Sequence, residues 1–470
     1  MKKRFLTRLS LVLISCSCMS CSPFIFDTPN GTGGNSNQDS EIDYEEFTGC
    51  KNSIFFALYN YYGYEKQHFT SKWEGMNEAL SEHGITVTGW QQEKDARKFK
   101  IKREADCDLP EDAQIYMVNN QNWDTGIQYN KPIVKYQPMA ILSTCNGVEF
   151  ASSVVASSGI GISNATMGGF AKEYREAFAN GTLKYLCAKY SAHLLPIFAA
   201  CVNAVDNGKA MKNADHTALS LSIVNWNIQS LKEYDEMAAV DSIAMDHPTM
   251  RKINVDKFFD DSTYKLDDGS AAKALSEYVA DSSKESIKAL YELNGTNQAE
   301  DEAGFVKKDD HKKEIKCGII APSSVNSSVQ SYIDFIQGYC AKAYGVTMLP
   351  IGSVTSSDTQ DKVAKTLISQ GADFIISLQD DTNRNAAAEM CNNNNVFFAI
   401  GGSCQNPKDY DAIKMLPYYV GSIGTSIDEE RRAAKEMTEY YLQCMIHRAK
   451  GDLKEFETLY KTGKWKKEED

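Results

Sequence analysis

A polar stretch at residues 379–385, with the sequence QDDTNRN, holds the side chains best suited to bind a small molecule. It follows an apolar run at 373–378 and combines two carboxylates with amides and one guanidinium. Carboxylates and amide oxygens accept hydrogen bonds from hydroxyl and amino groups, whereas a guanidinium donates them. Asp381 could instead cap the following helix, a common role for Asp at such a turn. The candidate ligand contacts in this stretch are Gln379, Asp380, Asn383 and Arg384.

Further candidates follow the other apolar runs of the chain. Aromatic rings follow the run at 54–59, where they could stack on a flat ligand or pack in the core. Asn and Ser follow later runs, where they could bind a polar ligand or cap a helix. After the run at 218–224, Asn225-Trp226-Asn227 could lie at a hinge, but a packed indole is the expected role of Trp226. The residues selected as ligand contacts are Tyr62, Phe69, Asn146, Asn164, Ser324, Asn326 and Ser403.

Little in the chain points to an enzyme. It lacks the metalloprotease pattern HExxH, the nucleophile elbow GxSxG, a P-loop and a complete GxGxxG. Its 7 histidines are dispersed, and none lies beside an evident nucleophile or metal partner in the sequence. His68 falls in the predicted first loop, where a polar contact explains it. We expect no catalytic activity, no cofactor and no metal.

Cys16 is a candidate for covalent modification. Basic residues at 2–4 precede an apolar stretch at 5–14, which is too short to cross about 30 Å of hydrocarbon and is typical of a signal peptide. The sequence LISC at 13–16 resembles the lipobox of bacterial lipoproteins, and this resemblance implies that the Cys16 thiol is acylated. The alternative is an ordinary signal peptide that contains cysteine. We expect a lipid-anchored protein on the extracytoplasmic side of the cell membrane.

Composition limits the kinds of partner. The formal net charge is -13, whereas a nucleic-acid-binding surface needs clustered Lys and Arg, so no nucleic acid is expected. The cysteines from Cys50 onward lack metal-ligand spacing, although one or two disulfides could form in an exported protein. Cys187 and Cys201 lie in apolar runs and are predicted to be small buried residues.

The body of the chain repeats one pattern of elements. Each half reads as strand, loop, helix and strand, beginning at 54–59 in the first half and at 316–321 in the second. This order is the unit of a parallel sheet with a right-handed crossover. We therefore predict an α/β protein with two Rossmann-like lobes, each built on a parallel sheet, and a ligand cleft between them. Further strands are predicted at 85–88, 139–144, 159–163, 346–350, 373–378 and 396–400, and helices at 73–84, 192–208, 329–345, 359–370 and 427–451.

Composition also divides the chain into segments. The stretch after Cys16 is rich in Gly, Asn, Ser and acidic residues, which cannot bury apolar area and should form a flexible tether. Charged, irregular sequence at 90–135 is read as an insertion in the first lobe. The predicted segments are a signal peptide at 1–15, the tether at 16–49, the first lobe at 50–235, a connecting region at 236–313 and the second lobe at 314–470.

The second half resembles the type I periplasmic-binding-protein fold, the fold of solute receptors for ABC importers. The likeness rests on GIIAPSSVNSS at 318–328, QGADFIIS at 370–377, NNVFFAIGG at 394–402 and YYVGSIG at 418–424. The first-half sequence at 68–87 is similar to the start of the basic membrane lipoprotein group, a purine-nucleoside-receptor type, through Phe69 and Trp73-Glu74-Gly75. That group has a sugar-binding Asp at a strand end where this chain has Gly402 and Ser403.

The pattern and the resemblance together predict a receptor. Ligands of parallel sheets bind beyond the carboxyl ends of the strands, where the selected residues lie. The expected protein binds a small polar solute, of sugar or nucleoside type, between its lobes as a monomer and delivers it to an ABC permease. The alternative is a surface or sensory lipoprotein that keeps the fold without a functional cleft.

Overall fold

The computed structural model describes residues 52–59, 66–93, 96–120, 138–144, 164–241, 252, 254–260, 262–287, 311–325, 327–355, 357–379 and 383–465. These residues belong to one compact unit, residues 39–470. The predicted signal peptide, the predicted tether and Cys16 lie outside the described residues. Within the described part, we find no helix with the length and apolar character needed to cross a membrane.

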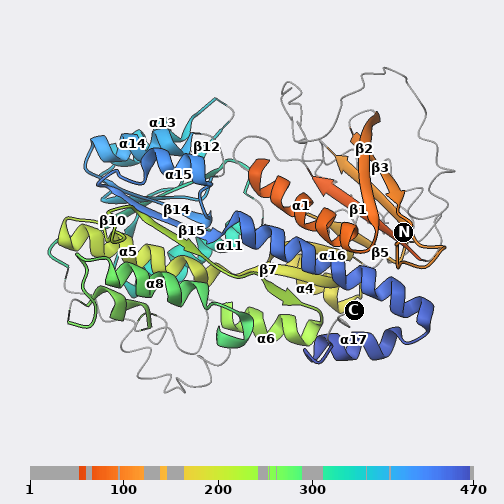
Figure 1. Ribbon diagram of the computed structural model, residues 1–470. Coiled ribbons are helices and arrows are strands. Elements are labelled where there is room, and N and C mark those ends of the chain that lie inside the picture. The colour runs from red at the N-terminus through yellow and green to blue at the C-terminus, as the bar shows by residue number, and fades with distance from the viewer. Residues whose placement is uncertain are drawn as a thin grey trace, which may run out of the picture. The chain divides into compact units, whose positions relative to one another are not determined.

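The first of two β-sheets is mixed (Figure 1). In spatial order its described strands are β2 (Ile85–Glu93), β3 (Ala96–Arg103), β4 (Gln114–Asn120), β1 (Ser53–Tyr59), β5 (Ala140–Ser143), β6 (Asn164–Gly169), β7 (Leu183–Lys189) and β9 (Trp226–Ile228). Pairing is parallel from β4 through β1, β5 and β6 to β7. The strands β2, β3 and β9 pair antiparallel with their neighbours.

The second sheet is parallel in every pairing of the described residues. Its strands are mostly continuous apolar runs, which is typical of parallel strands covered on both faces. In spatial order they are β11 (Thr347–Met348), β10 (Lys316–Pro322), β13 (Phe374–Ser377), β14 (Phe397–Ser403), β15 (Tyr419–Thr425) and β8 (Leu219–Ser222), and β12 (Gly352–Val354) also pairs with β10.

Helices cover both faces of the second sheet. The helix α5 (Leu195–Asn207) packs on one face, and α13 (Gln360–Ser369) and α14 (Arg384–Asn393) pack on the other. Alternate strand residues serve the two layers, because side chains along a strand point to opposite faces. Ile319 joins the core around Phe198 of α5, whereas its neighbour Ile320 joins the core around Leu367 of α13.

The remaining helices follow the chain order. In the first half they are α1 (Lys66–Glu82), α4 (Lys172–Ala179) and the 3₁₀ turn η3 (Ser191–Leu194). The central part contains α6 (Leu231–Asp241), the 3₁₀ turn η4 (Lys257–Phe259) and α8 (Ser270–Ala280). The second half adds α11 (Ser327–Phe335), the π-helix η5 (Ile336–Cys340), α12 (Ala341–Ala343), α15 (Pro407–Ile413), α16 (Ile427–Lys450) and α17 (Leu453–Lys461).

The helix α16 leaves the second sheet and packs along α1 of the first half (Figure 1). The two helices approach closely at Gly75, where a Cβ atom would lie 2.1 Å from the carbonyl oxygen of Arg431. An exposed ion pair between Glu82 and Lys435, with 2.5 Å between Oε1 and Nζ, lies farther along the same interface. Gly75, part of the sequence resemblance, is therefore required here for helix packing.

The chain passes between the two sheets more often than the predicted segments allow. The strand β8, inside the predicted first lobe, pairs with β15 of the second sheet, and α16, inside the predicted second lobe, packs on α1 and β7. Three short stretches make these passages, and we call them the crossing segments: residues 190–194 after β7, 223–225 between β8 and β9, and 426 between β15 and α16.

Three other sequence predictions need correction. The charged region 90–135 contributes β3 and β4 to the first sheet, and the strand predicted at 85–88 extends to Glu93 and pairs antiparallel. In β3, Lys98, Lys100 and Lys102 alternate with Phe99 and Ile101, the period of a strand with one polar face. The predicted boundary at 235 falls inside α6.

The described cysteines are free thiols, and Cys187 and Cys201 are fully buried, which confirms that prediction. Burial raises the pKa of the Cys404 thiol to about 12, so it is not a reactive thiolate. In the part of the chain that the structure describes, no group of His, Cys, Asp and Glu is arranged to hold a metal ion.

Candidate functional site

A buried carboxylate lies where strands of both sheets end. Glu430, in the first turn of α16, has a side chain that is 0% exposed. Its Oε1 lies 2.7 Å from Nζ of Lys189, the last residue of β7, and accepts a 2.5 Å hydrogen bond from Oγ1 of Thr425, the last residue of β15. Lys72 Nζ of α1 is 3.5 Å from Oε2, and His68 Nδ1 of α1 is 3.8 Å from Oε1. We call these five residues the strand-end cluster.

His68 also contacts the second sheet directly. Its Nε2 lies 3.3 Å from the carbonyl oxygen of Cys404, the residue that follows β14. Because a carbonyl oxygen can only accept, Nε2 carries the proton in this hydrogen bond. The imidazole is 5% exposed, so α1 brings a buried polar group to the ends of β14 and β15.

The start of α16 places Glu430 in the cluster. Ser426 is the N-cap, and its Oγ accepts a 3.1 Å hydrogen bond from the backbone N–H of Glu429. Asp428, Glu429 and Glu430 occupy the first turn, where the helix dipole stabilises negative charge. The Ser-x-x-Glu pattern thus fixes where the helix begins and where its first acidic residues point.

The cluster keeps Glu430 ionised. Burial alone would raise the pKa of this carboxyl, but the charges of Lys189 and Lys72 and a hydrogen bond and charge from His68 lower it well below its usual value. The two lysine charges of the cluster face a single carboxylate charge, that of Glu430.

Several buried polar atoms beside the cluster have no hydrogen-bond partner among the described residues. They are Oε2 of Glu430, Nε2 of His193 and both amide atoms of Asn225. His193 and Asn225 are 2% and 3% exposed, and both lie in crossing segments. Buried polar atoms are almost always hydrogen-bonded, since each unsatisfied one costs about 1–3 kcal/mol. A molecule bound here could supply the missing hydrogen bonds.

His193 is a neutral acceptor at this place. Its Nδ1 contacts the carbonyl oxygen of Tyr190 and must carry the proton, which leaves the lone pair on Nε2. Burial lowers the pKa of His193 to about 4, the Tyr190 carbonyl opposes this shift, and the charge of Lys189 adds to it. At neutral pH the imidazole therefore offers an acceptor and no positive charge.

Aromatic rings pack against one another at two of the crossing segments. The Trp226 indole is 1% exposed and stacks on Tyr190, with 4.0 Å between ring centroids and planes 3° apart. Its Nε1 donates a 2.9 Å hydrogen bond to the carbonyl oxygen of Ser282, and Phe170 meets it edge-on at 5.9 Å. The prediction of a packed indole at Trp226 is confirmed.

Two of the predicted ligand contacts, Gln379 and Arg384, form a separate network after β13. Arg384 is 1% exposed and donates from Nε to the Gln379 carbonyl oxygen at 2.7 Å. Gln360 donates to the same carbonyl at 3.2 Å and accepts from Ser377 Oγ at 2.6 Å. Asn383 is the N-cap residue of α14. These bonds hold the turn after β13 in shape, whereas Oε1 of Gln379 has no partner among the described residues.

Ser403 lies next to the strand-end cluster. It is the last residue of β14, is buried, and precedes Cys404, whose carbonyl binds His68. The preceding Gly402 has a φ of +90°, and a Cβ atom there would lie 3.2 Å from the Tyr332 ring. Both facts favour glycine at position 402.

Two predicted contacts are placed differently by the structure. Asn164 is the first residue of β6, so it lies at the amino end of a strand and cannot share the strand-end site. The strand was expected earlier because NATMGG at 164–169 has few large apolar residues. Phe69 was expected in a loop but lies within α1, because this helix already begins at Lys66.

The other predicted contacts give less information. Ser324 is exposed beyond the end of β10. Tyr62, Asn146, Asn326 and Asp380 lie outside the described residues.

Sequence reasoning missed most of the strand-end cluster. Lys189 ends the run LKYLCAK at 183–189, which could have been recognised as a strand with a cation at its carboxyl end. Glu430 follows the strand at 419–425 and a clear N-cap, but its partners come from positions 68, 72 and 189. A local sequence pattern cannot predict contacts between residues more than 200 positions apart in the chain.

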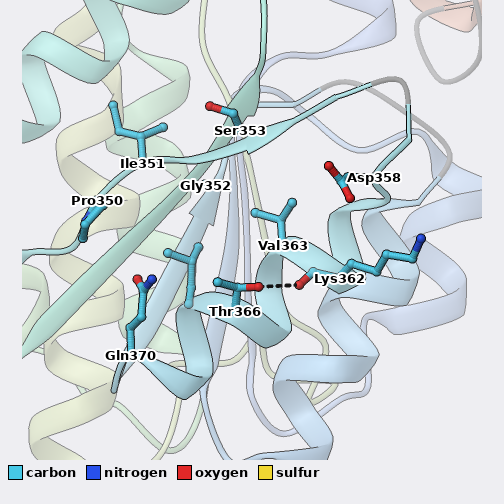
Figure 2. Close-up of a pocket in the computed structure, with 10 residues that line it drawn as sticks. Pro350, Ile351, Gly352, Ser353, Asp358, Lys362, Val363, Thr366 and Gln370 are labelled. Carbon is cyan, nitrogen blue, oxygen red and sulfur yellow. Dashed lines mark hydrogen bonds between the residues drawn. The ribbon is translucent and has the colours of Figure 1, made fainter.

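A pocket of about 260 Å³ lies elsewhere, at the edge of the second sheet (Figure 2). Figure 2 shows that the chain at 350–353 and the helix α13 form its two sides. Its polar groups include Asp358, Lys362 and Gln370, and none of its lining residues belongs to the strand-end cluster.

Comparisons with known proteins find likeness only among solved structures, since no protein-family model and no curated protein matches the chain. A periplasmic sugar-binding protein from Legionella pneumophila is 8% identical, with 85% of this chain and 95% of that chain covered and a TM-score of 0.40. A solute-binding protein from Agrobacterium vitis, bound with α-D-tagatopyranose, is 8% identical, with coverages of 85% and 89% and a TM-score of 0.41.

A benzoate complex of a solute-binding protein from R. palustris is also 8% identical, with coverages of 87% and 84% and a TM-score of 0.40. At these TM-scores the likeness carries no argument about this chain. The description as an α/β protein with two sheets rests on its own strand pairing.

Proposed function

We propose that this protein is an extracytoplasmic lipoprotein that binds a small, hydroxyl-rich solute at the strand-end cluster and delivers it to an ABC importer. The lipid anchor at Cys16 and the transporter are inferred from the sequence resemblances. The binding role rests on one observation, the unsatisfied buried polar atoms of Glu430, His193 and Asn225 beside the cluster.

The chemistry of these atoms supports the solute class. Glu430 Oε2, His193 Nε2 and Asn225 Oδ1 are all acceptors, so a matching ligand must present several donors. Hydroxyl groups of a sugar or polyol meet this need without adding charge. The nearby Lys72 and the amide nitrogen of Asn225 can donate to the oxygens of the same hydroxyls.

The position of the site also supports binding. Lys189 ends a strand of the first sheet, Thr425 and Ser403 end strands of the second sheet, and ligands of parallel sheets bind beyond such ends. Three crossing segments meet there, so a bound solute would contact residues tied to both sheets.

Thermal unfolding of the full chain with a panel of sugars, polyols, nucleosides, amino acids and aromatic acids tests the proposal. A binder present at 100 times its dissociation constant should stabilise the protein by about 2.7 kcal/mol. We expect neutral sugars or polyols to give the shift, and Asn225→Ala to reduce it. A panel without any stabilising compound, or stabilisation by aromatic acids alone, would contradict the proposal.

One observation favours a surface or sensory lipoprotein that binds no solute. Ser331 Oγ of α11 donates a 3.3 Å hydrogen bond to the carbonyl oxygen of Phe170, which follows β6. A Cβ atom on Gly169 would lie 3.1 Å from Ser328 Oγ. The end of β6 therefore packs directly on α11, where a larger ligand would need space. Unchanged hydrogen exchange of residues 169–170 with every compound of the panel would support this alternative.

A further inference from the structure

Glu429 has an unusual partner for a residue at the third position of a helix. In a Ser-x-x-Glu capping box, the glutamate side chain returns to the backbone N–H of the N-cap residue. Here Ser426 caps the helix, but Glu429 Oε1 accepts the backbone N–H of Asn225 at 2.7 Å. Asn225 lies in the crossing segment 223–225, so this carboxylate binds a different part of the chain.

Glu430, the next residue, contacts the residues that immediately precede the other two crossing segments. Its Oε1 is 2.7 Å from Nζ of Lys189, which immediately precedes segment 190–194. The same oxygen accepts from Oγ1 of Thr425, which immediately precedes residue 426. Two adjacent carboxylates on one helical turn thus contact one crossing segment and the residues that lead into the other two.

Both carboxylates are buried and are compensated by charge. Glu429 is 9% exposed and forms a two-point ion pair with Arg432, whose Nε and Nη2 each lie 2.7 Å from a carboxylate oxygen. Glu430 is compensated by Lys189 and Lys72. Removing one partner of a buried pair leaves an uncompensated charge, which is strongly unfavourable. The contacts are therefore specific in position and costly to break.

These segments carry the groups that would face a solute. Asn225, held through its backbone N–H, has an unpartnered side-chain amide, and His193 lies four residues beyond Lys189. The Oε1 atoms of the two carboxylates bind the Asn225 backbone, Lys189 and Thr425, whereas Oε2 of Glu430 makes none of these contacts.

We propose that Glu429 and Glu430 are positioning residues, which together hold the three crossing segments so that Asn225 and His193 are in place before a solute arrives. The use of this placement for binding rests on the proposed function, but the placement itself does not. It can be measured in the absence of any ligand.

Hydrogen exchange of the ligand-free full chain, followed by mass spectrometry, tests the proposal. Glu430→Gln keeps the size of the side chain and removes its charge, and Glu429→Gln does the same at the neighbouring position. We expect Glu430→Gln to speed exchange in 189–195 and 425–430 at least tenfold, and Glu429→Gln to do so in 223–228. Glu82→Gln is the matched control, because Glu82 pairs with Lys435 on the same helix interface.

The pattern of exchange separates positioning from general stability. Acceleration of the same size in every protected segment of the chain, or rates in the crossing segments within twofold of the unaltered protein, would overturn the proposal. Should Glu430→Gln fail to fold, Lys189→Gln removes the opposing charge from a side chain that is 21% exposed, and the same local acceleration is expected. Because no solute is present, failure of these results leaves the solute panel a separate test.

Discussion

Glu430 and His83 are both buried beside the interface of α1 and α16, and they are compensated in opposite ways. Glu430 is a carboxylate that faces two lysines and an imidazole. His83 is an imidazole, 1% exposed, that lies between two carboxylates: its Nδ1 is 2.8 Å from Asp108 Oδ1, and its Nε2 is 2.8 Å from Glu439 Oε2. The first group lies at the strand ends, and the second lies at the end of α1.

The difference shows which of the two can serve a ligand. Both ring nitrogens of His83 have a carboxylate partner, so this group is complete and acts as a structural tie. Glu430 Oε2 has the Lys72 ammonium at 3.5 Å but no hydrogen bond among the described residues, and His193 and Asn225 also carry buried polar atoms without such a bond. Burial of charge alone does not mark a site; unsatisfied hydrogen bonding at the strand ends does.

The pKa directions follow from the same contacts. Burial alone would lower the pKa of His83, but hydrogen bonds and charge from Glu439 and Asp108 raise it above its usual value. Among the described residues no carboxylate contacts a ring nitrogen of His193 to oppose burial in this way, and its pKa falls to about 4. The two histidines should therefore respond to pH in opposite directions.

The largest effect is expected from Glu430→Ala. Lys189 and Lys72 would lose the carboxylate that compensates them in a buried place, and the free energy of unfolding should fall by about 3–5 kcal/mol. Urea denaturation at neutral pH measures this change. Glu439→Ala is the comparison, because Glu439 is 17% exposed and Asp108 remains beside His83. Equal losses of unfolding free energy in the two variants would show that Glu430 contributes no more to stability than Glu439 does beside His83.

A smaller effect is expected from acid through His193. The unfolded chain binds a proton near pH 6.5 and the folded chain only near pH 4, so stability is complete above 6.5 and falls as the pH drops between these values. The full difference amounts to about 3 kcal/mol at pH 4. Urea titrations at several pH values measure the slope, and His193→Asn, which keeps a donor for the Tyr190 carbonyl, should reduce it. An unchanged slope in this variant would assign the acid response to other groups.

The smallest effect is expected from His83→Gln, and it has the opposite dependence on pH. Because the folded pKa of His83 is raised, its contribution is fully present below pH 6.5 and is lost as the pH rises through the folded value. The variant should lose about 1–3 kcal/mol at pH 6 and less at pH 9. Chemical denaturation at these two pH values measures the difference. A loss that grows toward pH 9 would contradict the charged state inferred for His83.

Much of the second sheet could be predicted from local sequence. The runs at 316–321, 373–378 and 396–400 correspond to β10, β13 and β14, and the helix predicted at 427–451 corresponds to α16. These strands are apolar along their length because both faces are covered, so their signal is strong. The same reasoning failed for β6, whose small residues give no such run, and for β3, whose lysines resemble a loop.

The candidate site was less accessible to sequence reasoning. The rule that ligands bind at strand ends selected Ser403 and Gln379 correctly as strand-end residues, but it did not select Lys189, Asn225 or Glu430. Gln379 lies in a turn held by Arg384 and Gln360, so part of the polar stretch that stood out in the sequence serves local structure.

By itself, the sequence determined the elements that depend on neighbours within a few residues: the apolar strands, the capped start of α16 at Ser426 and the alternation of strand and helix. Only the tertiary structure decided which strands share a sheet and which charges meet, as when Lys72, Lys189 and Glu430 come together. The physical reason is range. Helix caps and apolar runs depend on residues within one or two turns of the chain. A buried carboxylate is stable only where the tertiary fold places cationic side chains beside it.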